Sequence, residues 1–341
     1  MEFESVVEKK CLQLLQKALD FEATDVHLLP TKEAYSVYFR KYNRSIATGE
    51  IPLKLGDKMI SHLKYQSGLD ISERRRPQSG SFEYVEGVQT ISCRVSTLPS
   101  VTLNESIIIR LMLQDVAKNL EEIAFSMSAV SKLKKLAQNN QGIIFFCGPT
   151  GCGKSTTMYS LLNYCSNQLS KHVISLEDPV ENNQNQMLQV QVNEKSGVTY
   201  AIGLKAILRH SPDVIMIGEI RDSETAKIAI EAALTGHLVI TTIHAKDSFG
   251  CLHRLMDLGV SQVELQQTVL SIVTQSLVNK QQENRELTAL FEIMDDHLLL
   301  EAFDALKHQE NFSMPTDETI AYQVTKGVQH GQILANILTT P

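Results

Sequence analysis

The chain has 341 residues, of which 43% are apolar, enough to build two hydrophobic cores. Its 32 basic and 39 acidic side chains give a net charge of −7, so no overall positive field attracts nucleic acid or anionic lipid. The first residues are acidic, unlike a signal peptide, and no apolar run approaches the roughly 18 residues that cross a bilayer. We therefore expect a two-domain cytoplasmic protein that reaches a membrane only through a partner or a surface helix.

The six cysteines are scattered along the chain and form no C-x-x-C pair. This spacing argues against a structural zinc site and against a disulfide framework. We expect reduced thiols and no zinc at these positions, which are Cys11, Cys93, Cys147, Cys152, Cys165 and Cys251.

The first 114 residues read as an α+β domain. Apolar residues recur at helical spacing over 7–19, which predicts an amphipathic helix whose stripe is either a core face or a membrane anchor. A second helix is expected around 56–67. Alternating apolar and polar residues predict antiparallel strands at 35–40, 80–85, 90–95 and 107–110.

The pattern changes to helical spacing over 114–141, so we place the domain junction near 114–120 and a second domain at 120–341. Short apolar runs separated by helical patterns are typical of buried parallel strands in an α/β domain. We expect such strands at 143–146, 173–176, 214–217 and 238–241, followed after residue 262 by further helices and one strand at 287–293.

A glycine-rich segment after the first of these runs fits G-x-x-x-x-G-K-[ST]. In this motif backbone N–H groups surround a β-phosphate, the lysine reaches the β/γ oxygens and the serine ligates magnesium. The helix that follows favours phosphate at its N-terminus. A fortuitous glycine-rich turn is the alternative. We predict a nucleotide site, with Mg²⁺ at Ser155, formed by Gly148, Pro149, Thr150, Gly151, Cys152, Gly153, Lys154, Ser155 and Thr156.

Acidic residues follow two of the predicted parallel strands, at 177–181 and 218–222. Ligands of open α/β sheets bind at the carboxyl ends of the strands, so these acids are candidates for coordinating magnesium and activating water. For any one of them, a solvated carboxylate or a helix cap is the alternative. His244 follows Thr241-Thr242 at the end of another strand, where it can sense the γ-phosphate or be structural.

Cys152 lies inside the glycine-rich segment, next to the expected helix N-terminus. Such a position favours the thiolate form, and we expect bound ATP to protect this thiol from alkylation. An inert, buried thiol is the alternative.

Together these segments resemble the secretion ATPases of type II secretion and type IV pilus systems. The run from Thr199 to Ala226 is similar to the family's Walker B signature, 177–181 to its Asp box and 236–245 to its His box. Segments 23–28 and 68–80 resemble its PAS-like N-terminal domain. The resemblance implies an α/β protein in which a PAS-like α+β domain precedes a RecA-like P-loop domain with a mainly parallel sheet.

The resemblance also implies a homohexameric ATP hydrolase that uses Mg²⁺, with active sites between the two domains. It assigns Glu219 to magnesium, Glu181 to polarising the attacking water, and Arg94 and Arg110 to the γ-phosphate. Such arginines would stabilise transition-state charge and couple hydrolysis to motion. The alternative for each arginine is a sheet-face residue paired with a surface carboxylate.

Departures from the family narrow the expected function. Many relatives have an arginine at the position of Ser81, and the zinc-binding four-cysteine insertion and extra N-terminal module of larger assembly ATPases have no counterpart here. The C-terminal arginine motif of retraction ATPases also has no counterpart in 327–341. The chain most resembles compact ATPases that assemble the competence pseudopilus for DNA uptake in Gram-positive bacteria.

We therefore expect a motor that acts on a polytopic inner-membrane platform protein and binds no nucleic acid directly. The alternatives are a pilus retraction ATPase, a general type II secretion ATPase, and a scaffold that binds ATP without useful turnover. Direct DNA translocation is disfavoured by the net charge and by the single short basic run at 74–76.

Overall fold

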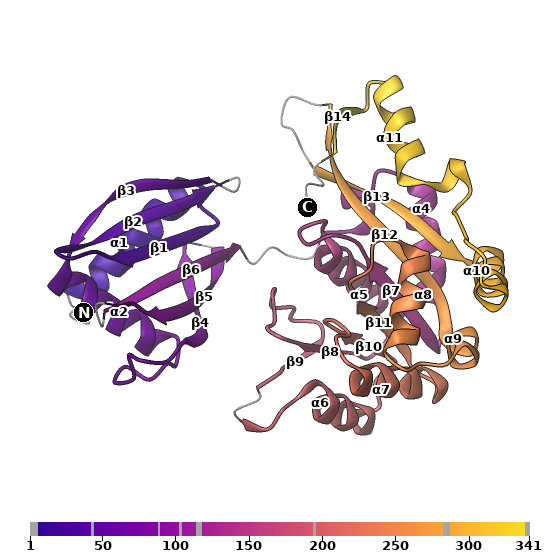
Figure 1. The fold of residues 1–341 in the computed structure, drawn as a ribbon, viewed down its shortest axis with the longest axis horizontal. Helices are drawn as coiled ribbons and strands as arrows, with labels where there is room; N and C mark the ends of the chain where they lie inside the picture. The colour runs from indigo at the N-terminus through magenta and orange to yellow at the C-terminus, as the bar shows by residue number, and fades with distance from the viewer. Residues whose placement is uncertain are drawn as a thin grey trace. The chain divides into compact units, whose positions relative to one another are not determined.

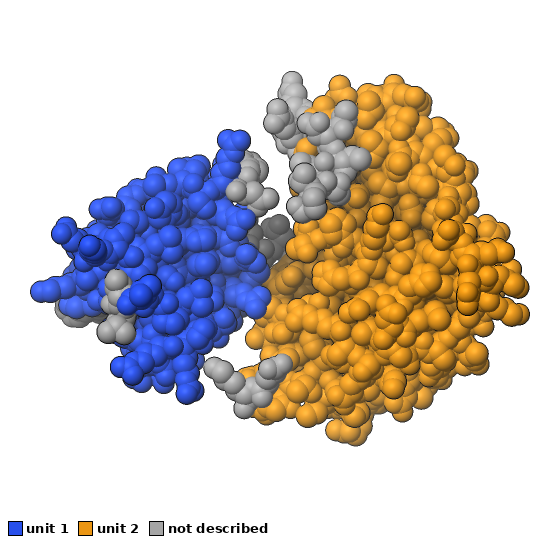
Figure 2. Space-filling view, viewed as in Figure 1, with its two compact units in different colours: residues 1–115 blue, residues 116–341 orange. Residues whose placement is uncertain are grey.

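The computed structural model of the protein describes residues 6–41, 44–87, 89–101, 104–113, 118–193, 196–281 and 287–337. The chain forms two compact units, residues 1–115 and 116–341 (Figure 2). Each unit has its own sheet and its own apolar core. The structure is of the mixed α/β class, with an antiparallel sheet first and a mainly parallel sheet second.

The first unit is built on a six-stranded antiparallel sheet with the order β3-β2-β1-β6-β5-β4 (Figure 1). Inward and outward side chains alternate along β2, as its sequence predicts. Two strands, β1 and β3, were not predicted; β3 is exposed almost throughout and so lacks a clear alternating pattern. The strands are β1 (Asp25–Pro30), β2 (Ala34–Lys41), β3 (Arg44–Pro52), β4 (Gln78–Glu86), β5 (Gln89–Pro99) and β6 (Glu105–Leu113).

Two helices, α1 (Val6–Asp20) and α2 (Leu53–Gln66), contribute to the core of this unit. The apolar stripe of α1 is buried in that core, at Cys11, Leu14, Leu15 and Ala18. The stripe is therefore a core face, and the membrane-anchor alternative for it is wrong. Among the described residues, no helix is long and apolar enough to span a membrane.

A buried ion pair ties α2 to β6. Lys64 Nζ lies 2.8 and 2.9 Å from the two carboxylate oxygens of Glu105 and donates a 2.6 Å hydrogen bond to Glu73 O. Both side chains are almost fully buried, so each charge depends on the other for compensation. The pair also holds the segment that leads into β4.

The second unit has a sheet with the order β13-β12-β7-β11-β10-β8-β9, and β14 also pairs with β12. The strands from β12 to β9 run parallel to their neighbours, whereas β13 and β14 are antiparallel to β12. The first five strands in chain order are β7 (Gly142–Cys147), β8 (Val173–Glu177), β9 (Leu188–Gln191), β10 (Val214–Ile217) and β11 (Leu238–Thr242).

The expectation of one strand after residue 262 is wrong, because the described part of this region contains three. They are β12 (Val269–Lys280), β13 (Leu287–Asp295) and β14 (Ile333–Ile337). The long strand β12 was missed because buried polar residues interrupt its apolar pattern, at Ser271, Thr274, Gln275 and Ser276. Its position between β13 and β7 in the sheet, rather than its hydrophobicity, makes it a strand.

Helices cover both faces of this sheet (Figure 1). One face packs against α4 and α5, and the other against α6 to α10, so the unit is a doubly wound α/β domain. The helices are α3 (Leu120–Ile123), α4 (Met127–Ala137), α5 (Lys154–Leu169), α6 (Tyr200–Ile207), α7 (Ser223–Leu234), α8 (Ser248–Asp257), α9 (Gln262–Thr268), α10 (Asp296–His308) and α11 (Ile320–Gln329).

Candidate functional site

The glycine-rich segment forms a tight loop between β7 and α5. Gly148, Gly151 and Gly153 have φ values of +134°, +82° and +87°, which residues with a Cβ rarely adopt. A Cβ on Gly148 would lie 2.8 Å from Gln275 O, and one on Gly153 would lie 2.9 Å from Gln275 Nε2. A Cβ on Gly151 would meet no atom, so this glycine borders open space. The loop therefore packs closely on β12 on one side and leaves its other side open to a ligand.

The loop ends where α5 begins, and Lys154 is the first residue of that helix. Lys154 Nζ donates hydrogen bonds of 2.7 Å to Gly148 O and 3.0 Å to Pro149 O, so the ammonium lies over the loop. Both acceptors are neutral carbonyl oxygens, whereas the oxygens of a phosphate are charged and would accept stronger hydrogen bonds from Lys154. Pro149, Thr150 and Thr156 are exposed, and Ser155 is half-buried. The segment fits a nucleotide phosphate.

Cys152 is the member of this segment whose side chain turns inward. It is only 2% exposed, and its Sγ lies 3.8 Å from Lys154 Nζ. This burial favours the alternative of a buried thiol, and protection of Cys152 from alkylation by nucleotide stays a prediction.

Gln275, in β12, packs against the glycine-rich loop and was not predicted as a site residue. Its Nε2 donates a 2.7 Å hydrogen bond to Cys152 O, and the side chain is buried. Its Oε1 is buried and has no hydrogen-bond partner among the described residues. A buried glutamine in a central strand needs a structural or functional reason, because an unpaired amide oxygen costs free energy. The sequence carries no local signal of this contact, because Gln275 and Cys152 lie 123 residues apart in the chain.

The carboxyl ends of β7, β11, β10 and β8 lie at one edge of the sheet, because these strands are parallel. The first predicted acidic cluster, 177–181, follows β8 at this edge. Glu177 is 3% exposed and accepts hydrogen bonds from Tyr159 Oη, from Ser175 Oγ at 2.5 Å and from Gln189 Nε2 at 3.1 Å. Glu177 is thus a buried structural carboxylate, whereas Asp178 and Glu181 are exposed.

The second cluster follows β10 and lies beside the end of β11. Glu219 is 18% exposed, accepts a hydrogen bond from Arg221 and has its Oε2 3.6 Å from His244 Nε2. The hydrogen bond to Glu219 raises the pKa of the Arg221 guanidinium, so its positive charge is fixed. Thr242 Oγ1 donates a 2.7 Å hydrogen bond to Gly218 O, which joins the two strand ends. The structure therefore brings Glu219 and His244 together and adds Arg221, which was not among the predicted residues.

The Ser155 hydroxyl and the Glu219 carboxylate are hard oxygen donors of the kind that Mg²⁺ prefers. Glu219 is partly buried at the sheet edge, and Ser155 is in the first turn of α5. The chemistry of these two oxygen donors fits the predicted metal.

Arg94 and Arg110 lie in the first unit, on β5 and β6. They are cross-strand partners in the register of the sheet, and both are exposed. Arg110 Nε donates a 2.9 Å hydrogen bond to Asp25 Oδ1, so Arg110 pairs with a carboxylate, but with a buried one and not with the surface carboxylate of the alternative. Ser81 is the partner of Arg94 on the other side, in β4.

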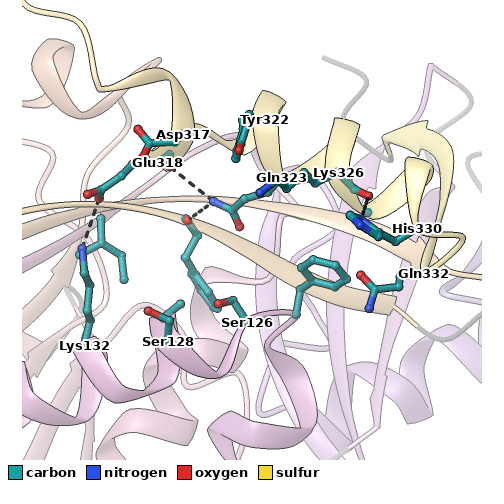
Figure 3. Close-up of a pocket in the computed structure, with 15 residues that line it drawn as sticks. Ser126, Ser128, Lys132, Asp317, Glu318, Tyr322, Gln323, Lys326, His330 and Gln332 are labelled. Atoms are coloured by element: carbon teal, nitrogen blue, oxygen red, sulfur yellow. Dashed lines mark hydrogen bonds and ion pairs between the residues drawn. The ribbon is translucent and has the colours of Figure 1, made fainter.

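A separate cavity of about 590 Å³ lies between α4, β13 and α11. Figure 3 shows Lys132 and Glu318 at one end of it, joined by a 3.2 Å ion pair. Its lining contains none of the predicted site residues. We therefore place the candidate site at the sheet edge beside the glycine-rich loop.

Comparisons with known proteins show which family the chain is similar to. Residues 2–319 match the family model described as Type II/IV secretion system protein. The chain is 35% identical over 346 residues to competence protein ComGA of Bacillus subtilis, an alignment that covers 97% of this chain and 96% of the relative. It is 36% identical to the type IV pilus assembly ATPase PilB of Thermus thermophilus, over 81% of this chain and 31% of that protein.

The fold also resembles that of solved structures. The crystal structure of the pilus retraction motor PilT with bound ADP superposes with a TM-score of 0.75 at 24% identity, covering 95% of this chain and 94% of the other. The ATPase DotB of Legionella pneumophila superposes with a TM-score of 0.70 at 20% identity, over 98% and 91% of the two chains. At these identities the likeness establishes the fold.

Proposed function

Because the chain belongs to the family of type II/IV secretion system proteins, we propose that it is a cytoplasmic ATPase that powers assembly of a type IV pilus-like competence pseudopilus for DNA uptake. The similarity to two ComGA competence proteins, over more than nine-tenths of this chain, supports the choice within the family. The observation that carries the enzymatic part is the glycine-rich loop beside exposed and half-buried acids at the same sheet edge.

In this proposal the loop from Gly148 to Thr156 holds the nucleotide phosphates through its backbone N–H groups, and Lys154 contacts the β/γ oxygens. Ser155 and Glu219 hold Mg²⁺, which supplies positive charge against the phosphates. Glu181 accepts hydrogen bonds from the attacking water and orients it. His244 lies beside Glu219, where it responds to the γ-phosphate.

Arg94 and Arg110 provide further positive charge at the γ-phosphate in the proposed mechanism. A guanidinium group keeps its charge throughout the cycle, and its contribution grows as the transition state develops negative charge. We propose that residues 1–114 act as a PAS-like domain and 120–341 as a RecA-like domain. The working form would be a homohexamer peripherally attached to the inner face of the membrane through a polytopic platform protein.

The first experiment measures phosphate release at saturating MgATP for Glu181→Gln. The amide keeps the size of the side chain but lowers its basicity, so we expect kcat to fall by about 10²-fold or more while nucleotide affinity changes little. Glu224→Gln is the matched control: Glu224 is an exposed glutamate in the same unit, and its carboxylate pairs only loosely with Lys205 at 3.7 Å. An unchanged rate in Glu181→Gln would remove Glu181 from its proposed role.

A second experiment separates the cellular alternatives. A deletion strain is scored for surface filaments and for DNA uptake. Loss of both supports an assembly motor, whereas accumulation of filaments contradicts it and supports retraction. A purified wild-type protein that binds ATP but releases no phosphate, even with the membrane partner present, would instead support the scaffold alternative.

A further inference from the structure

One buried hydroxyl group joins three elements of the second unit. Tyr159 lies in the second turn of α5, the helix that begins at Lys154, and its side chain is buried. Its Oη donates a hydrogen bond to Glu177 Oε2 at the end of β8. The same oxygen accepts a 3.4 Å hydrogen bond from the backbone N–H of Asn182. Tyr159 therefore connects α5, the helix that follows the glycine-rich loop, with both ends of the segment 177–182.

The backbone of Asn182 is held from its other side by Gln189, in β9. Gln189 Nε2 donates hydrogen bonds of 3.0 Å to Asn182 O and 3.1 Å to Glu177 Oε1. Gln189 Oε1 in turn accepts a 2.6 Å hydrogen bond from the N–H of Gln184. The residue next to Glu181 is thus fixed at its N–H by Tyr159 and at its carbonyl by Gln189.

The carboxylate of Glu177 organises this network. It is almost completely buried and accepts hydrogen bonds from Tyr159, Ser175 and Gln189. A buried carboxylate requires such donors, and each hydrogen bond to it is stronger than one between neutral groups. Burial raises the pKa of Tyr159, and the adjacent charge of Glu177 raises it further, so the phenol keeps its proton and remains a donor.

Glu181 itself is exposed, and it immediately precedes Asn182, whose backbone N–H and carbonyl are held. An exposed side chain can orient a water molecule reproducibly only if its backbone is fixed, and a small misplacement of a catalytic group is costly. Among the described contacts of this segment, those of Tyr159 and Gln189 fix residue 182 directly.

We propose that Tyr159 is a positioning residue for ATP hydrolysis. Through its hydrogen bonds with Glu177 and Asn182, Tyr159 fixes the position of Glu181 relative to the glycine-rich loop. The inference rests on the role proposed above for Glu181. It predicts that the hydroxyl of Tyr159 affects the hydrolytic step and leaves nucleotide binding nearly unchanged.

The test uses Tyr159→Phe in the full-length protein, because this change removes the hydroxyl and keeps the ring in the core. We expect kcat for phosphate release to fall about 10-fold, with KM for ATP and the dissociation constant for ADP within about twofold of wild type. Tyr164→Phe is the matched control on the same helix: its ring faces Lys134 Nζ at 4.8 Å, and its hydroxyl is outside the network. A proportional loss of binding and turnover in Tyr159→Phe would contradict the proposal.

A double-mutant cycle with Glu181→Gln separates positioning from general destabilisation. If Tyr159 acts through Glu181, Tyr159→Phe slows single-turnover phosphate release in the wild-type background and has almost no further effect in Glu181→Gln. An equal slowing in both backgrounds overturns the inference while the role of Glu181 stands. An unchanged rate in Glu181→Gln alone instead overturns the proposed function.

Gln189→Met provides a second route to the same answer if Tyr159→Phe folds poorly. It removes the hydrogen bonds to Asn182 O and Glu177 at a half-buried position and keeps a side chain of similar length. The same pattern is expected: a fall in kcat, nearly unchanged nucleotide affinity, and no additivity with Glu181→Gln. Full additivity in this cycle also overturns the inference.

Discussion

Arg94 and Arg110 lie opposite each other on neighbouring antiparallel strands, so both project from the same face of the first sheet. The row continues with Asp25 in β1, the cross-strand partner of Arg110, and with Ser81 in β4, the partner of Arg94. Like charges on facing positions are unfavourable unless they are compensated. On its other side Asp25 pairs with Arg40 in β2, so the row contains three guanidinium groups and one carboxylate, which suits it to an additional anion.

We predict that Arg94→Ala and Arg110→Ala each lower kcat for phosphate release by about 10- to 100-fold, because each removes a fixed charge that stabilises the transition state. Nucleotide affinity should change less than kcat. The measurement is steady-state phosphate release with ADP affinity determined in parallel. Arg44→Ala, an exposed arginine on β3 in the same unit, is the control. Variants of Arg94 and Arg110 that hydrolyse ATP as fast as this control would contradict the assignment.

The ion pair between Arg110 and Asp25 predicts a pH dependence of stability. Burial acts to raise the pKa of Asp25, but hydrogen bonds from Arg110 and Thr24 and the charges of Arg110 and Arg40 outweigh it and lower the pKa. A carboxyl group with a lowered pKa in the folded state stabilises the protein above its ordinary pKa of 3.8, and this contribution is lost as the pH falls below that value.

Asp25→Asn should therefore reduce the free energy of unfolding at pH 6, and the difference from wild type should shrink toward pH 3. The effect should be about 1 kcal/mol or less, since Arg110 is 57% exposed and solvent screens the pair. Urea unfolding followed by circular dichroism at several pH values measures it. A difference that is independent of pH would show that the charge of Asp25 contributes nothing.

Gly151 and Gly153 should differ in their tolerance of alanine. Gly151 and Gly153 share a positive φ, so both substitutions should carry a strain of about 1–2 kcal/mol. Only at Gly153 does the new Cβ also collide with Gln275 Nε2, which is held by its hydrogen bond to Cys152 O. Gly153→Ala should destabilise the protein by about 1 kcal/mol more than Gly151→Ala in urea unfolding without nucleotide. Equal losses of unfolding free energy in the two variants would mean that the Gln275 side chain moves aside without cost.

Gln275 should contribute to nucleotide affinity through the loop backbone. Gln275→Ala removes the hydrogen bond to Cys152 O, and we expect ADP to bind about 5-fold more weakly, equivalent to about 1 kcal/mol. Gln323→Ala is a close control: Gln323 Nε2 donates a hydrogen bond of the same 2.7 Å length to a backbone carbonyl, Phe291 O, beside the separate cavity (Figure 3). Isothermal titration should show a loss for Gln275 alone; similar losses in both variants would point to general destabilisation.

The sequence by itself determined those features of the protein that depend on neighbouring residues. Helical spacing predicted α1 and its buried stripe, and short apolar runs predicted β7, β8, β10 and β11, because such strands are covered on both faces. The glycine-rich motif also identified its loop from neighbouring residues alone, because the positive φ values at Gly148, Gly151 and Gly153 exclude most other residue types.

Tertiary structure decided everything that depends on partners distant in the chain. Gln275 meets the loop across 123 residues, and Arg110 meets Asp25 across 85, so neither contact leaves a local pattern. Glu177 and Glu181 look alike in the sequence, but one is buried by Tyr159, Ser175 and Gln189 and the other faces solvent. The polarity of β12 hid a central strand, because packing between β7 and β13 outweighs local propensity. A residue's type is fixed by the sequence, whereas its burial and its charge partners are fixed only when the strands assemble.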